Sequence, residues 1–186
     1  MYLASMEVNG YEIKPDADLE GAMLVGVNLH GANLERANLT NAKLSGANLH
    51  GVNLSNADLS GADLGGAYLY KANLNNASLI DAILAKIDAT GADFTCANLT
   101  DADMTGAKLS QAKMWTAVLF KANLENAKLS GTNLFQANLN KSNLKGADLT
   151  EAYLFGATLR DAVTSGANFK YATLRGAEMP NGTIHD

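Results

Sequence analysis

The sequence predicts an all-β solenoid, a chain wound into coils, and a five-residue repeat is the observation that predicts it. Leu occupies 26 of the 33 positions reached in steps of five from Leu19 to Met179, and Ala occupies 28 of the 33 positions two residues earlier. Five is neither the 3.6-residue period of an amphipathic helix nor the two-residue period of a flat strand. A coil with one short extended piece and one turn per five residues buries these Leu and Ala side chains together.

Composition and charge agree with a single folded domain and exclude some functions. The 186 residues are 47% hydrophobic, carry a net charge of -5 and include one Cys. No apolar stretch approaches 18 residues, so we expect no membrane span. The start of the chain lacks the basic and apolar regions of a secretory signal, so we expect a cytoplasmic protein. The negative charge argues against direct binding of nucleic acid.

The N-terminal segment, residues 1–16, precedes the repeat. It contains Val8-Asn9-Gly10-Tyr11, and an Asn-Gly pair between apolar residues is a strong signal for a β-hairpin. An open coil edge is vulnerable in any solenoid, because its backbone groups are unpaired. We therefore expect residues 6–16 to cap the first coil.

The repeat itself, residues 17–179, reads as units such as Ala47-Asn48-Leu49-His50-Gly51 and Ala57-Asp58-Leu59-Ser60-Gly61. This pattern closely resembles the pentapeptide-repeat family, and most closely its cyanobacterial members of unassigned activity. The resemblance implies a right-handed parallel β-helix of square cross-section, with four pentapeptides in each of about eight coils. Residue n would then stack on residue n+20.

The C-terminal segment, residues 180–186, begins with Pro180-Asn181-Gly182, which predicts a turn that ends the helix. Ile184 follows this turn. We expect it to cover the last coil, so that both ends of the β-helix carry short caps.

Two units depart from the repeat. In one, Ile87 replaces the small inward residue and Ala89 the large one, and we expect these opposite volume changes to compensate in the core. In the other, Thr164 takes a Leu position, where a buried hydroxyl needs a hydrogen-bond partner. A functional kink at either unit is the less favoured interpretation.

The outward positions contain one notable column. Trp115, Phe135 and Phe155 are spaced by twenty residues, with Tyr153 on the same face and Phe120 around the next corner. Three rings one coil apart would form a continuous apolar stripe, which favours contact with a second copy or with a partner protein. The alternative is that the rings only stabilise the sheet, as cross-strand pairs do.

Two weaker features remain. His30 and His50 are also one coil apart and could share a metal ion, although no carboxylate or Cys in their column supplies a third ligand. Exposed ladder residues are the favoured interpretation of this pair. Cys96 is predicted to face outward, as a surface thiol rather than a nucleophile.

Enzyme motifs are absent from the sequence, and a rod without loop insertions offers no obvious concave site. We therefore predict a non-catalytic structural or protein-interaction module without a cofactor. The family resemblance suggests an alternative, in which an acidic rod mimics DNA and modulates a type II topoisomerase (DNA gyrase). Residues 1–93 hold 11 acids and 5 bases, but residues 94–186 hold 8 acids and 9 bases, which weakens this alternative. Metal or small-ligand binding at His30 and His50 is a remote third hypothesis.

Overall fold

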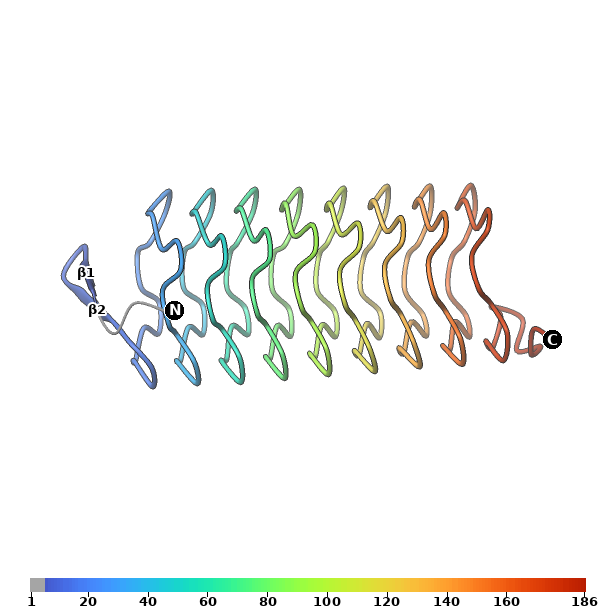
Figure 1. Cartoon of the computed structure of the whole chain (residues 1–186), viewed down its shortest axis with the longest axis horizontal. Coiled ribbons are helices and arrows are strands. Elements are labelled where there is room, and N and C mark those ends of the chain that lie inside the picture. Colours follow the sequence, from blue (N-terminus) through green and yellow to red (C-terminus); the bar gives the residue numbers. More distant parts are fainter. Residues whose placement is uncertain (1–5) are drawn as a thin grey trace.

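A hairpin forms at the N-terminal Asn-Gly pair. The computed structural model describes residues 6–186, in which β1 (Met6–Val8) and β2 (Tyr11–Ile13) pair antiparallel. The turn between them has positive φ angles at Asn9 (52°) and Gly10 (80°), as a tight hairpin turn requires. Ile13 is buried, and the hairpin lies at the N-terminal end of the rod (Figure 1). It therefore packs against the first coil.

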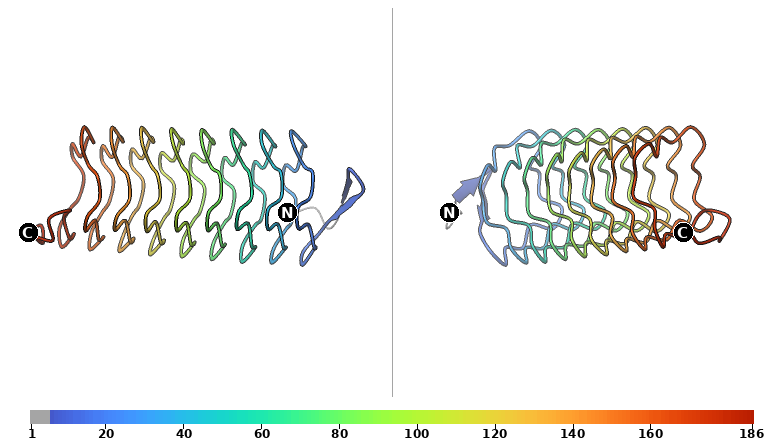
Figure 2. Two further views of the ribbon diagram at one scale, coloured as in Figure 1. Left: turned by 180° about the vertical axis from the view of Figure 1, so that it is seen from behind. Right: turned by 45° about the vertical axis from the view of Figure 1, so that its right-hand side comes forward.

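The remainder of the chain winds into a series of stacked coils (Figures 1 and 2). The coils form a right-handed parallel β-helix of square cross-section, which confirms the predicted fold class. Parallel bridges join residue n to residue n+20, and eight such steps lead from Asp18 to Glu178. The bonds run in both directions, because Asn38 N–H donates to the carbonyl of Ala17 (2.9 Å) and Leu19 N–H donates to that of Asn38 (2.7 Å). Four pentapeptides thus complete each coil.

Every corner of the square is a short turn closed by one hydrogen bond. In the first unit, Ala22 N–H donates to the carbonyl of Leu19 at 3.0 Å, and Gly21 between them has a φ of 63°. Glycine reaches this left-handed conformation without strain, and Asn and Asp tolerate it better than most residues. Glycine is therefore concentrated where the chain bends, whereas most Asn and Asp residues of the repeat lie at the bridged positions between the bends.

The core consists of the inward Leu and Ala residues, nearly all of them inaccessible to solvent from the first coil to the seventh. The exceptional unit with Ile87 and Ala89 is equally buried, at 0% exposure for both residues. Phe94, on the adjacent face of the same coil, is also fully buried. The coil that has lost one Leu side chain at Ala89 thus carries a larger ring at Phe94, the next inward position that Leu usually occupies.

Two inward positions carry hydroxyl groups in place of Ala. Thr132 is fully buried, and its Oγ1 donates a hydrogen bond to the carbonyl of Leu109. Ser142 is equally buried, but its Oγ has no hydrogen-bond partner within residues 6–186. One hydroxyl is thus satisfied within the coil, whereas the other is a local defect.

The two ends of the β-helix differ. In the last coil, Phe169, Leu174 and Met179 are only partly buried, and Ile184, which pairs antiparallel with Glu178, is 61% exposed. The prediction that Ile184 covers this coil is therefore wrong, because its side chain points into solvent. Thr164 also lies in this open coil and is partly exposed, so water can satisfy the hydroxyl that was expected to need a partner.

Candidate interaction surface

One side of the square carries a group of large aromatic side chains. This side, called the aromatic face, carries two outward columns. One is the bridged column that runs from Asn33 to Thr173, and the other lies two residues later along the chain and includes Trp115. On the aromatic face lie Trp115, Phe135, Tyr153 and Phe155, which are called the aromatic cluster. Trp115 and Tyr153 are 48% and 39% exposed. Rings this large and this exposed are candidates for a contact surface.

Three of the four rings pack together. The centroids of Phe135 and Phe155 are 5.8 Å apart, and those of Phe135 and Tyr153 are 6.2 Å apart. Tyr153 and Phe155 belong to the same unit and have centroids 6.3 Å apart. All three planes lie within 12° of parallel. The n+20 spacing thus brings these rings into one ordered group.

Trp115 stands apart from this group. Within residues 6–186 its indole makes no ring contact of this kind, so the stripe is not continuous as the spacing predicts. A pocket of about 230 Å³ lies here instead, lined by Trp115, Asn133, Phe135 and Tyr153. Its lining is almost entirely apolar, so the pocket can receive one large apolar side chain. Trp115 therefore lines a pocket and does not extend the stack of rings.

Phe120 does not join the aromatic cluster. It lies on the adjacent face, where Lys121 Nζ is 5.5 Å and Lys141 Nζ is 5.8 Å from the ring centroid. A ring between two ammonium groups makes cation–π contacts within its own face. The structure thus separates this residue from the surface with which the sequence grouped it.

The charges on the aromatic face are partly paired. Lys113 Nζ lies 3.4 Å from Asp93 Oδ2. Burial raises the pKa of Asp93, but hydrogen bonds from Thr95 and the charge of Lys113 together outweigh it, so the pKa falls below its ordinary value. Arg175, one coil beyond Phe155 in the same column, makes no ion pair within residues 6–186. Arg175 is not among the residues predicted from the sequence, although it follows Phe155 by twenty residues.

The two histidines do lie side by side. The rings of His30 and His50 have centroids 4.7 Å apart and are inclined at 72°, and Tyr70 stands against His50 at 5.1 Å. Among residues 6–186, no three His, Cys, Asp or Glu side chains are placed to hold a metal ion. Cys96 is exposed and contacts Thr116, with Sγ and Oγ1 3.2 Å apart. Neither the histidine pair nor Cys96 is part of a metal-binding or catalytic cluster within residues 6–186.

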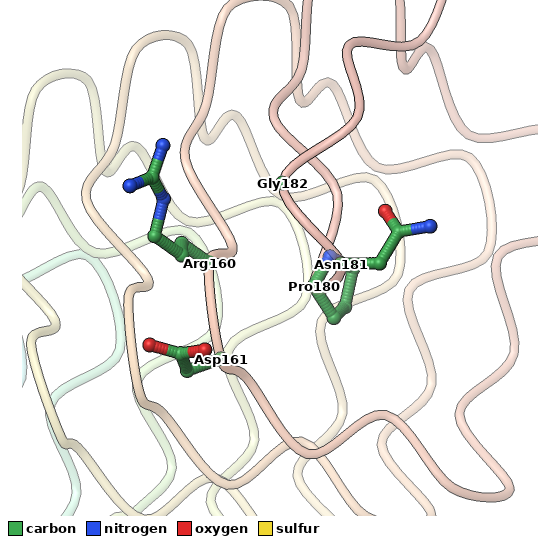
Figure 3. Close-up of a pocket in the computed structure, with 5 residues that line it drawn as sticks. All are labelled: Arg160, Asp161, Pro180, Asn181 and Gly182. Atoms are coloured by element: carbon green, nitrogen blue, oxygen red, sulfur yellow. The ribbon is translucent and has the colours of Figure 1, made fainter.

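A second pocket, of about 390 Å³, lies near the C-terminal turn (Figure 3). It is lined by Arg160, Asp161, Pro180, Asn181 and Gly182. Arg160 is already engaged, because its Nε and Nη2 donate to Oε1 of Glu178. The guanidinium therefore fastens the last coil, and this pocket offers no further charged group except Asp161.

The comparisons with known proteins agree with the repeat and the coil. The model of the family described as pentapeptide repeats matches residues 16–111 and 117–182 in overlapping segments. The chain belongs to the pentapeptide-repeat family. Members of this family are generally non-catalytic. No curated protein matches the sequence significantly. In the part of the chain that the structure describes, no helix is long and apolar enough to cross a membrane.

Several solved structures resemble this pentapeptide-repeat chain. HetL, a protein involved in heterocyst differentiation regulation in the cyanobacterium Nostoc sp. strain PCC 7120, is 36% identical, with 92% of this chain and 76% of HetL covered and a TM-score of 0.45. A trypsin-treated form of QnrB1, a plasmid-mediated fluoroquinolone resistance protein, is 25% identical, with 82% and 77% covered and a TM-score of 0.64. Rfr23 from the cyanobacterium Cyanothece 51142 is 26% identical, with 87% and 89% covered and a TM-score of 0.16.

Proposed function

We propose that this pentapeptide-repeat protein is a non-catalytic interaction module and that the aromatic cluster is its contact surface. The observation that carries the proposal is the apolar pocket beside three ordered, partly exposed rings. Aromatic residues around a pocket are typical of the few positions that dominate binding energy in protein interfaces. A rigid β-helix holds the rings in place before contact, which lowers the entropic cost of binding.

The interpretation that the rings only stabilise the sheet leaves two features unexplained. Trp115 contributes no ring contact to its neighbours, yet it is 48% exposed. The pocket beside it also exposes apolar surface to water, which is less favourable than covering that surface with a partner. Both features favour a surface that a partner covers.

The test compares association of the wild type with that of a variant in which Trp115, Phe135 and Phe155 are replaced by Ser. Capture of proteins from the source cells, together with the solution mass, should show that the variant loses contacts that the wild type makes. Tyr68→Ser with Tyr70→Ser is the matched control, because both rings are exposed on a different face. If the triple variant kept every contact of the wild type, the aromatic cluster would not be the contact surface.

The second candidate is protection of a type II topoisomerase by mimicry of DNA. The likeness to QnrB1, with a TM-score of 0.64, favours it. The distribution of charge does not, because a duplex carries one negative charge per ~1.7 Å. Here lysines pair with the acids of neighbouring coils, as Lys108 does with Asp88 at 3.3 Å. A supercoiling assay with purified DNA gyrase, with and without a fluoroquinolone, tests this candidate function. The function requires that added protein changes the supercoiling, and an unchanged supercoiling activity would exclude it.

A further inference from the structure

The aromatic face shows a regular order of side chains across four successive coils. Bridges place Lys113, Asn133, Tyr153 and Thr173 on consecutive coils. The outward column beside them reads Trp115, Phe135, Phe155, Arg175. Neighbouring strands are ~4.8 Å apart, so the outer members of each column are about 14 Å apart.

We infer that the partner of this surface is a second copy of the chain, packed antiparallel through the aromatic face. The inference rests on the proposed function and names its partner. A two-fold axis would lie in the interface, perpendicular to the rod and midway between the coils of Phe135 and Phe155. Such an axis makes each column face itself in reverse order. Trp115 of one copy then faces Arg175 of the other, and Phe135 faces Phe155.

The column is self-complementary in this arrangement. Arg175 is exposed and unpaired within the described residues 6–186, and the half-exposed indole of Trp115 offers the best ring face for a guanidinium. Phe155 of the second copy comes to the level of Phe135, where the pocket of about 230 Å³ opens. Each dimer holds two such ring insertions and two such cation–π pairs, because the axis repeats every contact.

The neighbouring column also agrees with the reversed order. Asn133 would face Tyr153 of the second copy. Within residues 6–186, neither the Asn133 side-chain amide nitrogen nor the Tyr153 hydroxyl makes a hydrogen bond, so the two groups can bind each other. Lys113 would face Thr173, so no like charges meet.

A parallel dimer, with the axis along the rod, is less favourable. Each column would then face the other column at the same level. Phe135 would meet the polar Asn133, and Arg175 would meet Thr173 instead of a ring. The antiparallel arrangement is therefore the one that satisfies the unpaired cation.

The contact spans only four coils, so the interface is smaller than a standard one and the dimer should be weak. Light scattering and sedimentation from micromolar to about millimolar protein should show the mass rise toward that of a dimer. Arg175→Glu should raise the dissociation constant of the dimer about tenfold, because two cation–π pairs are lost. Lys121→Glu, which reverses an exposed cation on the adjacent face, is the matched control and should change little.

An exchange variant gives the sharpest test. Trp115→Arg combined with Arg175→Trp restores the same facing pair, so its dimer should be stronger than that of either single variant. Trp115 is also the only Trp in the chain, and its fluorescence should change with concentration in the wild type and at about tenfold higher concentration in Arg175→Glu.

The outcomes separate the two proposals. A wild type that stays monomeric to about millimolar concentration overturns the self-contact and leaves the interaction surface to the capture experiment. A dimer that the triple Ser variant still forms overturns the self-contact through these rings. A dimer that the Ser variant loses, but that Arg175→Glu leaves intact and the exchange variant does not restore, overturns the antiparallel register while supporting the surface.

Discussion

The buried hydroxyl of Thr132 donates a hydrogen bond of 2.7 Å to the carbonyl oxygen of Leu109, one coil away. Ser142 occupies an equivalent inward position and has no such partner within residues 6–186. The two residues therefore test what a hydrogen bond contributes inside this core.

Replacement of these two hydroxyls should have opposite effects on stability. Thr132→Val should lower the free energy of unfolding by about 1 kcal/mol, because it removes a made hydrogen bond without changing shape. Ser142→Ala should raise it by about 1 kcal/mol, because it removes an unpaired polar group. Chemical denaturation measures both, and a destabilised Ser142→Ala would show that the hydroxyl binds an internal water.

Position along the stack should determine the cost of losing a Leu side chain. Leu99 is fully buried in the middle of the rod, so Leu99→Ala should cost about 2–5 kcal/mol. Leu174 lies in the open last coil and is partly buried, so Leu174→Ala should cost roughly half as much or less. Leu99→Lys should prevent cooperative folding, since it buries an unpaired charge. Thermal unfolding compares the three variants, and equal costs for the two Ala variants would contradict the open end.

Stability should fall in acid as the aspartates of the ladder become protonated. The pKa of Asp148 lies below its ordinary value of 3.8, because Thr150 donates hydrogen bonds to the carboxylate, more than offsetting burial, and Lys128 lies nearby. The folded state thus favours the ionised form, so this contribution is present above pH 3.8 and is lost as pH falls through the folded pKa. NMR titration should show a higher pKa for Asp148 in Thr150→Val than in the wild type.

Zinc should not bind firmly at the paired histidines. Two imidazoles supply two ligands, whereas structural zinc sites use four and catalytic sites three. Micromolar zinc should therefore leave the ring resonances of His30 and His50 unchanged. Shifts of both resonances that His50→Gln abolishes would establish a metal site on this column.

The period of five predicts the core because each unit buries two side chains, a small one that is usually Ala and a large one that is usually Leu. It identifies every Leu and Ala of the interior, and the Asn9-Gly10 pair predicts the hairpin of β1 and β2. The family resemblance, and not the period, predicts that residue n lies against residue n+20.

The surface is predicted less well from the sequence, because packing does not restrict an exposed side chain to one rotamer. Twenty-residue spacing brings Phe135 and Phe155 together but does not show that Trp115 stays outside their stack and lines a pocket. For the same reason an apolar residue after the final turn was expected to be buried, although Ile184 is exposed. The roles of Trp115 and Arg175, which flank the two Phe residues in the outward column on the aromatic face, become visible only when the geometry of the coils is known.

Insertions into the chain meet two separate constraints. The five-residue unit determines which side chains point inward, and the bridges between residue n and residue n+20 determine which outward side chains are aligned. Insertion of one pentapeptide between Trp115 and Phe135 would keep every Leu and Ala inward, but it would carry Phe135 a quarter turn to the adjacent face. Insertion of four pentapeptides would keep both the interior and every outward column. Folding therefore tolerates growth in steps of five residues, whereas the outward columns stay aligned only when the chain grows in steps of twenty.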